Sequence, residues 1–193
     1  MTDAKPVILG HSALHRGYLS VDRVRYRLDG KEVSREVERH GDAAVVLPYD
    51  PVRRCALLVR LPRAPVLVAT GQSDLVEACA GMIGHDENSA DAARREAREE
   101  LGLTLVDLEQ VGRVWSSPGV STERLTLFLA AYSAADRKGE GGADGEDEAI
   151  TVLERPLAAL ADEADCGEIV DAKLLLLLQM LRLRQPALFG PAA

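Results

Sequence analysis

A charged segment with helical character lies at residues 81–103, which read GMIGHDENSADAARREAREELGL. Polar capping residues near its middle precede a run of strong helix formers, and Gly102 is placed to end the helix. We therefore predict a helix over residues 88–101. Glu96 and Glu100 stand four residues apart in this helix, and Glu99 is three residues from Glu96. These three side chains, the helix glutamates, can all lie on one helix face.

The crowded carboxylates have two interpretations. On charge pattern alone, a solvated surface helix is the simpler one, with Arg95 paired to Glu99 or to Asp91. A bound cation is the other, because like charges at this spacing cost about 0.2–0.5 kcal/mol per pair unless a cation lies between them. Magnesium prefers oxygen ligands and binds through a few carboxylates together with substrate phosphates.

The spacing of the whole segment favours the second interpretation. Seven of its positions resemble the fixed positions of the Nudix box: Gly81, Glu87, Arg95, Glu96, Glu99, Glu100 and Gly102. With a frequency of roughly 0.07 for each fixed residue, the chance of such a coincidence is about one in 10⁸ starting points. The resemblance implies an α+β fold, the Nudix α/β/α sandwich of mixed sheets and helices.

The resemblance also implies a metal site. The helix glutamates would bind Mg²⁺, with Mn²⁺ as an alternative, and the backbone carbonyl of Ala80 would be a further ligand. Glu87 and Arg95 would hold the loop against the helix, while Gly81 would let the chain turn beside the metal. Glu100 is in addition a candidate catalytic residue.

Outside the box, the pattern indicates a small N-terminal β part and one larger domain. Residues 21–28 alternate in polarity and precede a tight turn at Asp29-Gly30, which predicts an N-terminal hairpin too poor in large apolar residues to form a core alone. Further strands are expected at 43–49, 55–60, 75–80, 111–117, 124–132 and 149–154. Pro156 can begin a helix that runs through about Glu163, and Asp171 can cap a final helix. We predict an N-terminal β subdomain at 1–41, the hydrolase domain at 42–186 and a tail at 187–193.

Composition narrows the partners and the compartment. The net charge of −8 over 193 residues argues against a nucleic-acid partner. No apolar run approaches the roughly 20 residues that span a bilayer, and the first residues lack the features of a secretory signal, so we expect a cytoplasmic protein. Cys55, Cys79 and Cys166 have no metal-ligand spacing and are expected to be reduced.

Residues 20–182 resemble the nucleoside diphosphate sugar branch of the family, the bacterial GDP-mannose pyrophosphatases and their ADP-ribose pyrophosphatase relatives. Residues 75–81, LVEACAG, carry Glu77 and Cys79 in the branch's pattern before the box, and Pro118 lies fifteen residues after Leu103. The resemblance implies hydrolysis of GDP-mannose to GMP and mannose 1-phosphate, or of ADP-ribose to AMP and ribose 5-phosphate. Cys79 favours the sugar-nucleotide reading over ADP-ribose.

Other candidate site residues lie outside the box. Arg60 and Arg63 could clamp a phosphate, although solvent-facing arginines are common at strand ends and the residues between these two depart from the branch's pattern. Glu77 and Pro118 are further candidates for substrate binding. The acidic loop at 139–148 offers Glu146 and Glu148 as general base or additional metal ligand, or it has no catalytic role.

Two further expectations concern assembly and activity. The resemblance implies a homodimer in which the N-terminal hairpin packs across the partner subunit and helps to bind the base. The rival function is a non-catalytic Nudix-type module that senses a nucleotide. Such modules usually have a broken box, whereas every acidic position is intact here.

Overall fold

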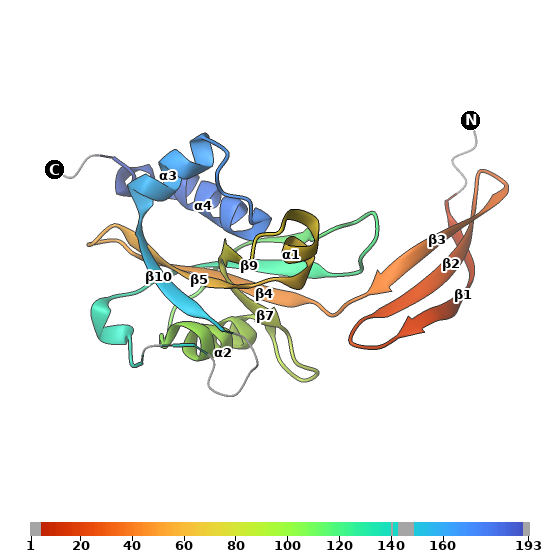
Figure 1. Cartoon of the computed structure of the whole chain (residues 1–193), viewed down its shortest axis with the longest axis horizontal. Helices are drawn as coiled ribbons and strands as arrows, with labels where there is room; N and C mark the ends of the chain where they lie inside the picture. Colours follow the sequence, from red (N-terminus) through yellow and green to blue (C-terminus); the bar gives the residue numbers. More distant parts are fainter. Residues whose placement is uncertain (1–4, 140, 143–148, 191–193) are drawn as a thin grey trace. The chain divides into compact units, whose positions relative to one another are not determined.

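The computed structural model describes residues 5–139, 141–142 and 149–190 (Figure 1). The chain forms two compact units. The first comprises Met1–Asp42 with Val114–Leu125, and the second comprises Ala43–Arg113 with Thr126–Ala193. The boundaries predicted from sequence, 1–41, 42–186 and 187–193, assign residues 114–125 to the larger domain instead and stay predictions.

The first unit contains a three-stranded antiparallel sheet in the order β1-β2-β3, formed by Val7–Arg16, Ser20–Leu28 and Lys31–Arg39. The predicted hairpin is β2–β3, and Asp29 and Gly30 in its turn have φ values of 49° and 76°. Strand β1 was not predicted. Register shifts after Ile8 and Ala13 interrupt its pairing with β2, so its apolar residues do not alternate along the chain.

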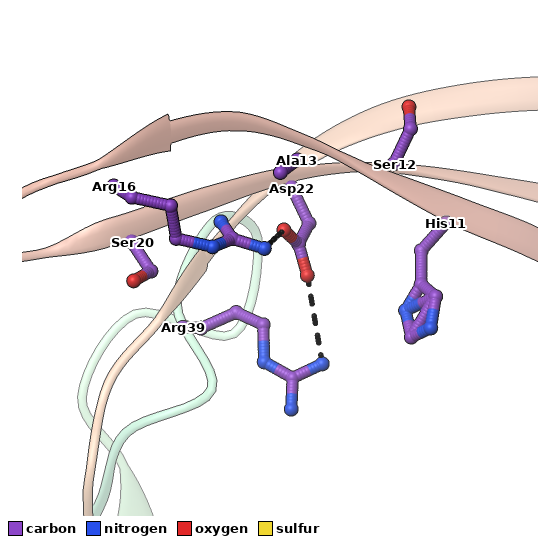
Figure 2. A pocket seen from close by; sticks show the side chains of 7 residues that line it. All are labelled: His11, Ser12, Ala13, Arg16, Ser20, Asp22 and Arg39. Atoms are coloured by element: carbon purple, nitrogen blue, oxygen red, sulfur yellow. Dashed lines mark hydrogen bonds and ion pairs between the residues drawn. The ribbon is translucent and has the colours of Figure 1, made fainter.

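This sheet has almost no core of its own. Asp22 is the one buried residue of its three strands, whereas Ile8 in β1 and Tyr18 in the following turn are exposed. A pocket of about 440 Å³ lies on the sheet. In it, Arg16 and Arg39 both point toward the carboxylate of Asp22 (Figure 2), at 2.5 and 3.6 Å. The first unit therefore presents a polar pocket and several unburied apolar side chains.

The second unit is built on a seven-stranded sheet. Its main path has the order β10-β5-β4-β9-β8, while β6 pairs with β5 and β7 pairs with β4. The strands are β4 (Ala43–Asp50), β5 (Cys55–Pro62), β6 (Asp74–Glu77), β7 (Cys79–Met82), β8 (Glu109–Trp115), β9 (Arg124–Ala131) and β10 (Thr151–Pro156). The helices are α1 (Ala64–Thr70), α2 (Ser89–Leu101), α3 (Leu157–Asp165) and α4 (Ala172–Arg184), with 3-10 turns at Ala134–Asp136 and Pro186–Leu188.

Helices cover both faces of this sheet. Within the second unit, Figure 1 shows α2 on one face and α3 with α4 on the other. All eight residues of β4 are buried because α2 and α4 both pack on this strand. The buried residues of α4 are Leu174, Leu177, Leu178 and Leu181, which have the spacing of one helix face. None of the helices in the described part of the chain is long and apolar enough to cross a membrane.

Two elements differ from the sequence prediction. Helix α1 was missed because it has only seven residues, has a proline as its second residue and buries none of its side chains. The strand predicted at 75–80 is two strands, because β4 and β5 pair only beside their turn, at Tyr49↔Ala56 and Asp50↔Cys55, and then separate. Strand β6 pairs with β5 and β7 with β4, so the chain passes from one to the other at Ala78.

Candidate active site

Helix α2 confirms the helix predicted over residues 88–101. The side chain of Asn88 accepts hydrogen bonds from the backbone N–H groups of Ala90 and Asp91, and Gly102 ends the helix with a φ of 64°. Its buried apolar residues are Ala92, Ala93, Ala97 and Leu101. Because three of these four are alanines, the helix backbone can lie close to the sheet. The neighbouring glutamates are thereby brought to β7, against which α2 packs.

Two of the helix glutamates meet the backbone of β7. Glu100 is only 6% exposed, and its Oε2 accepts a hydrogen bond of 3.3 Å from the backbone N–H of Ala80. Glu96 lies against Gly81 so closely that a Cβ built on this glycine would be 1.8 Å from Glu96 Oε1. The φ of Gly81 is not positive, so glycine is needed here for space rather than for a turn.

The buried thiol of Cys79 lies close enough to the three helix glutamates to be affected by their negative charge. Burial raises the pKa of Cys79 well above its usual range, and all three helix glutamates raise this pKa further. The carboxylates are therefore near enough to one another to act on a single group. Cys79 itself is an uncharged thiol, and all three cysteines are free, as predicted.

Arg95 supplies positive charge between the crowded carboxylates. Its Nη1 donates to Glu96 Oε1 at 2.7 Å and to Glu99 Oε2 at 3.0 Å. Its Nε and Nη2 each donate to the carboxylate of Glu87 at 3.0 Å, and Nη2 also donates to the carbonyl of Met82 at 2.9 Å. The predicted clamp of Glu87 and Arg95 between loop and helix is therefore present, and it lowers the pKa of Glu87. Asp91 pairs with Arg94 instead.

The side chains at this site suit a hard divalent cation by their chemistry. In the described ranges, no three His, Cys, Asp or Glu side chains are arranged so that they could hold a metal ion. Glu96 and Glu99 point to Arg95, whereas Glu100 faces Ala80. Carboxylate oxygens on one helix face beside a strand backbone are the donors that Mg²⁺ prefers. A cation would have to replace Arg95 at two of these carboxylates.

Of the predicted substrate-binding residues, Arg63 and Glu77 are brought together. Arg63 Nε donates to Glu77 Oε1 at 2.7 Å and Nη2 donates to Oε2 at 3.2 Å, while Glu77 is only 2% exposed. Lys173 Nζ donates to the same carboxylate at 2.9 Å. Arg60 is an exposed residue of β5, between Thr151 of β10 and Val76 of β6 in the register. Sequence analysis missed Lys173, whose only signal is its position in the first turn of α4, directly before five leucines.

Pro118 and the acidic loop are placed differently. Pro118 lies in the first unit, in a turn where the N–H groups of Val120 and Ser121 donate to the carbonyl of Ser117. Glu146 and Glu148 lie outside the described residues. Just before them, the N–H of Gly142 donates to the carbonyl of Glu100 at 2.9 Å and that of Lys138 donates to Gly102 at 2.8 Å. Lys138 and Gly142 therefore lie beside the C-terminal end of α2.

The sandwich of the second unit and the acidic helix beside β7 are the features of a Nudix-type domain. A NUDIX domain model matches residues 39–177. The GDP-mannose pyrophosphatase of Cronobacter sakazakii is 40% identical over 178 residues, which cover 89% of this chain and 92% of the relative. That of Escherichia coli O1:K1 is 34% identical over 176 residues, covering 88% and 91%.

A solved structure described as an ADP compounds hydrolase has the same fold. Its TM-score is 0.77 at 22% identity, over 95% of this chain and 96% of that one. The chain therefore belongs to the Nudix family and is a hydrolase of that family. The predicted fold class is confirmed. Hydrolases of this family generally use divalent metal ions.

Proposed function

We propose that this protein hydrolyses the pyrophosphate of a nucleoside diphosphate sugar. GDP-mannose, giving GMP and mannose 1-phosphate, is the first candidate, and ADP-ribose, giving AMP and ribose 5-phosphate, is the second. The observation that carries the proposal is the complete set of helix glutamates on α2, two of which lie against β7, in a chain that covers nine tenths of GDP-mannose pyrophosphatases. An intact acidic set favours a catalyst over a nucleotide sensor.

The helix glutamates would hold Mg²⁺, or alternatively Mn²⁺, together with the backbone carbonyl of Ala80. A bound divalent cation supplies positive charge to a diphosphate and makes a bound water more acidic. If Glu96 and Glu99 turned to a cation, Arg95 would still have its three contacts with Glu87 and Met82. The loop thus stays attached to the helix in either arrangement of the carboxylates.

The proton of the attacking water needs an acceptor. The candidates are Glu100, Glu146 and Glu148. A new bond from the water oxygen to one phosphorus forms as the bond from that phosphorus to the bridging oxygen breaks, and the bridging oxygen leaves with the other phosphate. The hydrogen bond from Gly142 to the carbonyl of Glu100 supports a role for the acidic loop, because it fixes the start of that loop beside the catalytic helix.

Substrate would be held by residues outside α2. The guanidinium of Arg63 suits a phosphate because its planar fork can donate two parallel hydrogen bonds. Arg60 lies three residues earlier, near the C-terminal end of β5. Glu77 would act from its buried position beside Arg63. Pro118 stays a proposed substrate residue on the basis of its position in the sequence.

A substrate panel tests the proposal. Purified protein with Mg²⁺ should release a monophosphate from GDP-mannose or from ADP-ribose, and chelation of the metal should stop the release. Glu100→Gln should lose nearly all activity while remaining folded, whereas Glu109→Gln, an exposed glutamate of β8, should retain it. Nucleotide binding without turnover of either substrate would instead make this chain a sensor module.

We also propose that the protein is a homodimer in which the N-terminal sheet contacts the partner subunit and helps to bind the base. The support is the apolar surface left on this sheet: Val7, Ile8, Leu14, Tyr18, Leu19 and Leu28 are all exposed. Sedimentation of the full chain should give the mass of a dimer. A variant without residues 1–40 that remained an active dimer would contradict this arrangement.

A further inference from the structure

A group of four charged side chains, of which the two carboxylates are buried, links helix α4 to the end of strand β5. We call Arg63, Glu77, Asp171 and Lys173 the charge network. Lys173 Nζ donates to Glu77 Oε2 at 2.9 Å and to Asp171 Oδ1 at 2.7 Å, and Glu77 in turn accepts two hydrogen bonds from Arg63. Both carboxylates are buried, whereas 35% of the Arg63 side chain is exposed. The network therefore reaches solvent mainly through the guanidinium of Arg63.

Local structure explains why Asp171 is present, but it does not explain Lys173 and Glu77, which connect Asp171 to Arg63 in the network. Asp171 caps α4 by accepting from the N–H groups of Lys173 and Leu174, and it also accepts from the N–H of Ala78 at 3.2 Å. This aspartate has three backbone donors without the ammonium of Lys173. A buried pair of Lys173 and Glu77 is weak support for stability, because desolvation offsets most of the attraction between the charges. The pair calls for a role other than holding the fold.

The position of the network suggests this role. Arg63 directly follows β5, and Glu77 ends β6, one residue before the crossing point at Ala78 and three before Ala80. Ala80 is the residue whose N–H contacts Glu100. The carboxylate that orients Arg63 is therefore part of the same short segment that leads into the proposed metal site.

We propose that Lys173 and Glu77 are positioning residues that present the guanidinium of Arg63 to a phosphate group of the substrate. The inference rests on the proposed function and deepens it. Glu77 orients Arg63 by accepting from both Nε and Nη2. Lys173 is a second cation at the carboxylate of Glu77. Part of the positive charge of Arg63 therefore stays available to a phosphate.

The charges of the network favour this division of roles. Burial raises the pKa of Glu77, but hydrogen bonding to Arg63 and the charge of Lys173 outweigh this effect, so the pKa lies below its usual value. Burial likewise lowers the pKa of Lys173, but Asp171 and Glu77 outweigh it and the net shift is upward. The network contains two cationic and two anionic side chains. Without Lys173 the group would carry an excess negative charge, which repels an anionic substrate.

Kinetics of Lys173→Met test the proposal, with GDP-mannose and Mg²⁺. We expect KM to rise about tenfold, the effect of one charge-assisted hydrogen bond, with kcat within about twofold of the wild type. Lys173→Arg, which keeps the charge, should restore most of the affinity. The matched control is Arg182→Met, which removes a cation from the same helix, where Arg182 pairs with Asp165 at 2.7 Å. This control should leave both constants unchanged.

A double-mutant cycle asks whether Lys173 acts through Arg63. In an Arg63→Met background, Lys173→Met should produce no further loss of kcat/KM. An equal loss in both backgrounds, or an unchanged KM in the single variant, would overturn the inference. If Lys173→Met does not fold, Glu77→Gln takes its place in the same cycle, with the same two outcomes.

The two proposals fail in different ways. A wild-type protein that hydrolyses no nucleoside diphosphate sugar refutes the proposed function and, with it, this inference. An active wild type whose KM does not respond to Lys173→Met refutes the inference alone.

Discussion

Replacing Gly81 with alanine adds one methyl group beside the carboxylate of Glu96. The new Cβ would lie 1.8 Å from Oε1 and 2.0 Å from the carboxyl carbon, whereas ordinary contact begins at 3.4 Å. The carboxylate must therefore move by about 1.6 Å, the difference between 3.4 and 1.8 Å. Misplacing a reacting group by about 1 Å can cost about 100-fold in rate. We expect a fall in kcat/KM of this order.

The same change should leave the free energy of unfolding within about 1 kcal/mol of the wild type. The atoms in the way belong to the end of a flexible side chain, so the backbone does not have to move. The contact between Arg95 and Glu96 is worth less than about 1 kcal/mol at a partly exposed site. Against this loss, alanine restricts the unfolded chain and contributes about 0.4–1 kcal/mol, since the φ of Gly81 is not positive.

The assay pairs the rate of monophosphate release, with Mg²⁺ in excess, with a urea unfolding curve. Gly112→Ala in β8 is the control, because its Cβ would lie 3.9 Å from the nearest atom, in Leu127, an ordinary contact. If Gly81→Ala retained more than about a third of the activity, Glu96 would not need to lie against the glycine for catalysis. A loss of several kcal/mol in stability would instead show that the methyl group meets rigid structure.

Three further predictions concern stability and reactivity. Asn88→Ala should lower the free energy of unfolding by about 1 kcal/mol in urea titrations, because it removes the acceptor that caps α2. Glu77 has its pKa lowered from 4.5 by Arg63 and Lys173 against the effect of burial, so its stabilising contribution is present above pH 4.5 and is lost as the pH falls through the lower folded value. The difference in unfolding midpoint between wild type and Glu77→Gln should therefore shrink below pH 4.5. Iodoacetamide should modify only Cys166 in the native protein, as measured by mass spectrometry, because burial raises the pKa of the other two thiols.

Each of these predictions has its control. Asn88→Asp keeps an acceptor at the helix start and should retain the stability of the wild type. A difference in midpoint that stayed constant down to pH 3 would show that the pKa of Glu77 is the same in the folded and the unfolded chain. The unfolded protein should take up three alkyl groups, one for each cysteine, whereas native labelling of Cys79 would contradict its burial beneath α2.

The arrangement of Arg95 bears on how the site changes when a cation binds. Its guanidinium spans three carboxylates, two of which are proposed metal ligands and one of which belongs to the loop. A cation that takes Glu96 and Glu99 exchanges one positive partner for another, so the repulsion between neighbouring glutamates is limited in both states.

Local sequence was sufficient for α2 and its ends. The spacing of the helix glutamates, the capping side chain of Asn88 and the glycine after Leu101 are all short-range features, so the helix and its acidic face could be predicted residue by residue. The tight turn at Asp29-Gly30 and the cap at Asp171 were predicted for the same reason. The seven box positions also indicated the Nudix family, and the match of the NUDIX domain model confirms this family.

The tertiary structure decided what depends on contacts between distant parts of the chain. The break between β6 and β7 arises because β4 and β5 separate, and no residue near Ala78 signals it. Lys173 reaches Glu77 across 96 positions of sequence, and this contact buries a carboxylate that the sequence suggested only as a substrate ligand. Periodicity and capping are properties of neighbouring residues, whereas pairing of buried charges depends on which strands and helices pack together. Local sequence features therefore predict the acidic helix α2 and the family, whereas packing sets how the residues around this helix are held.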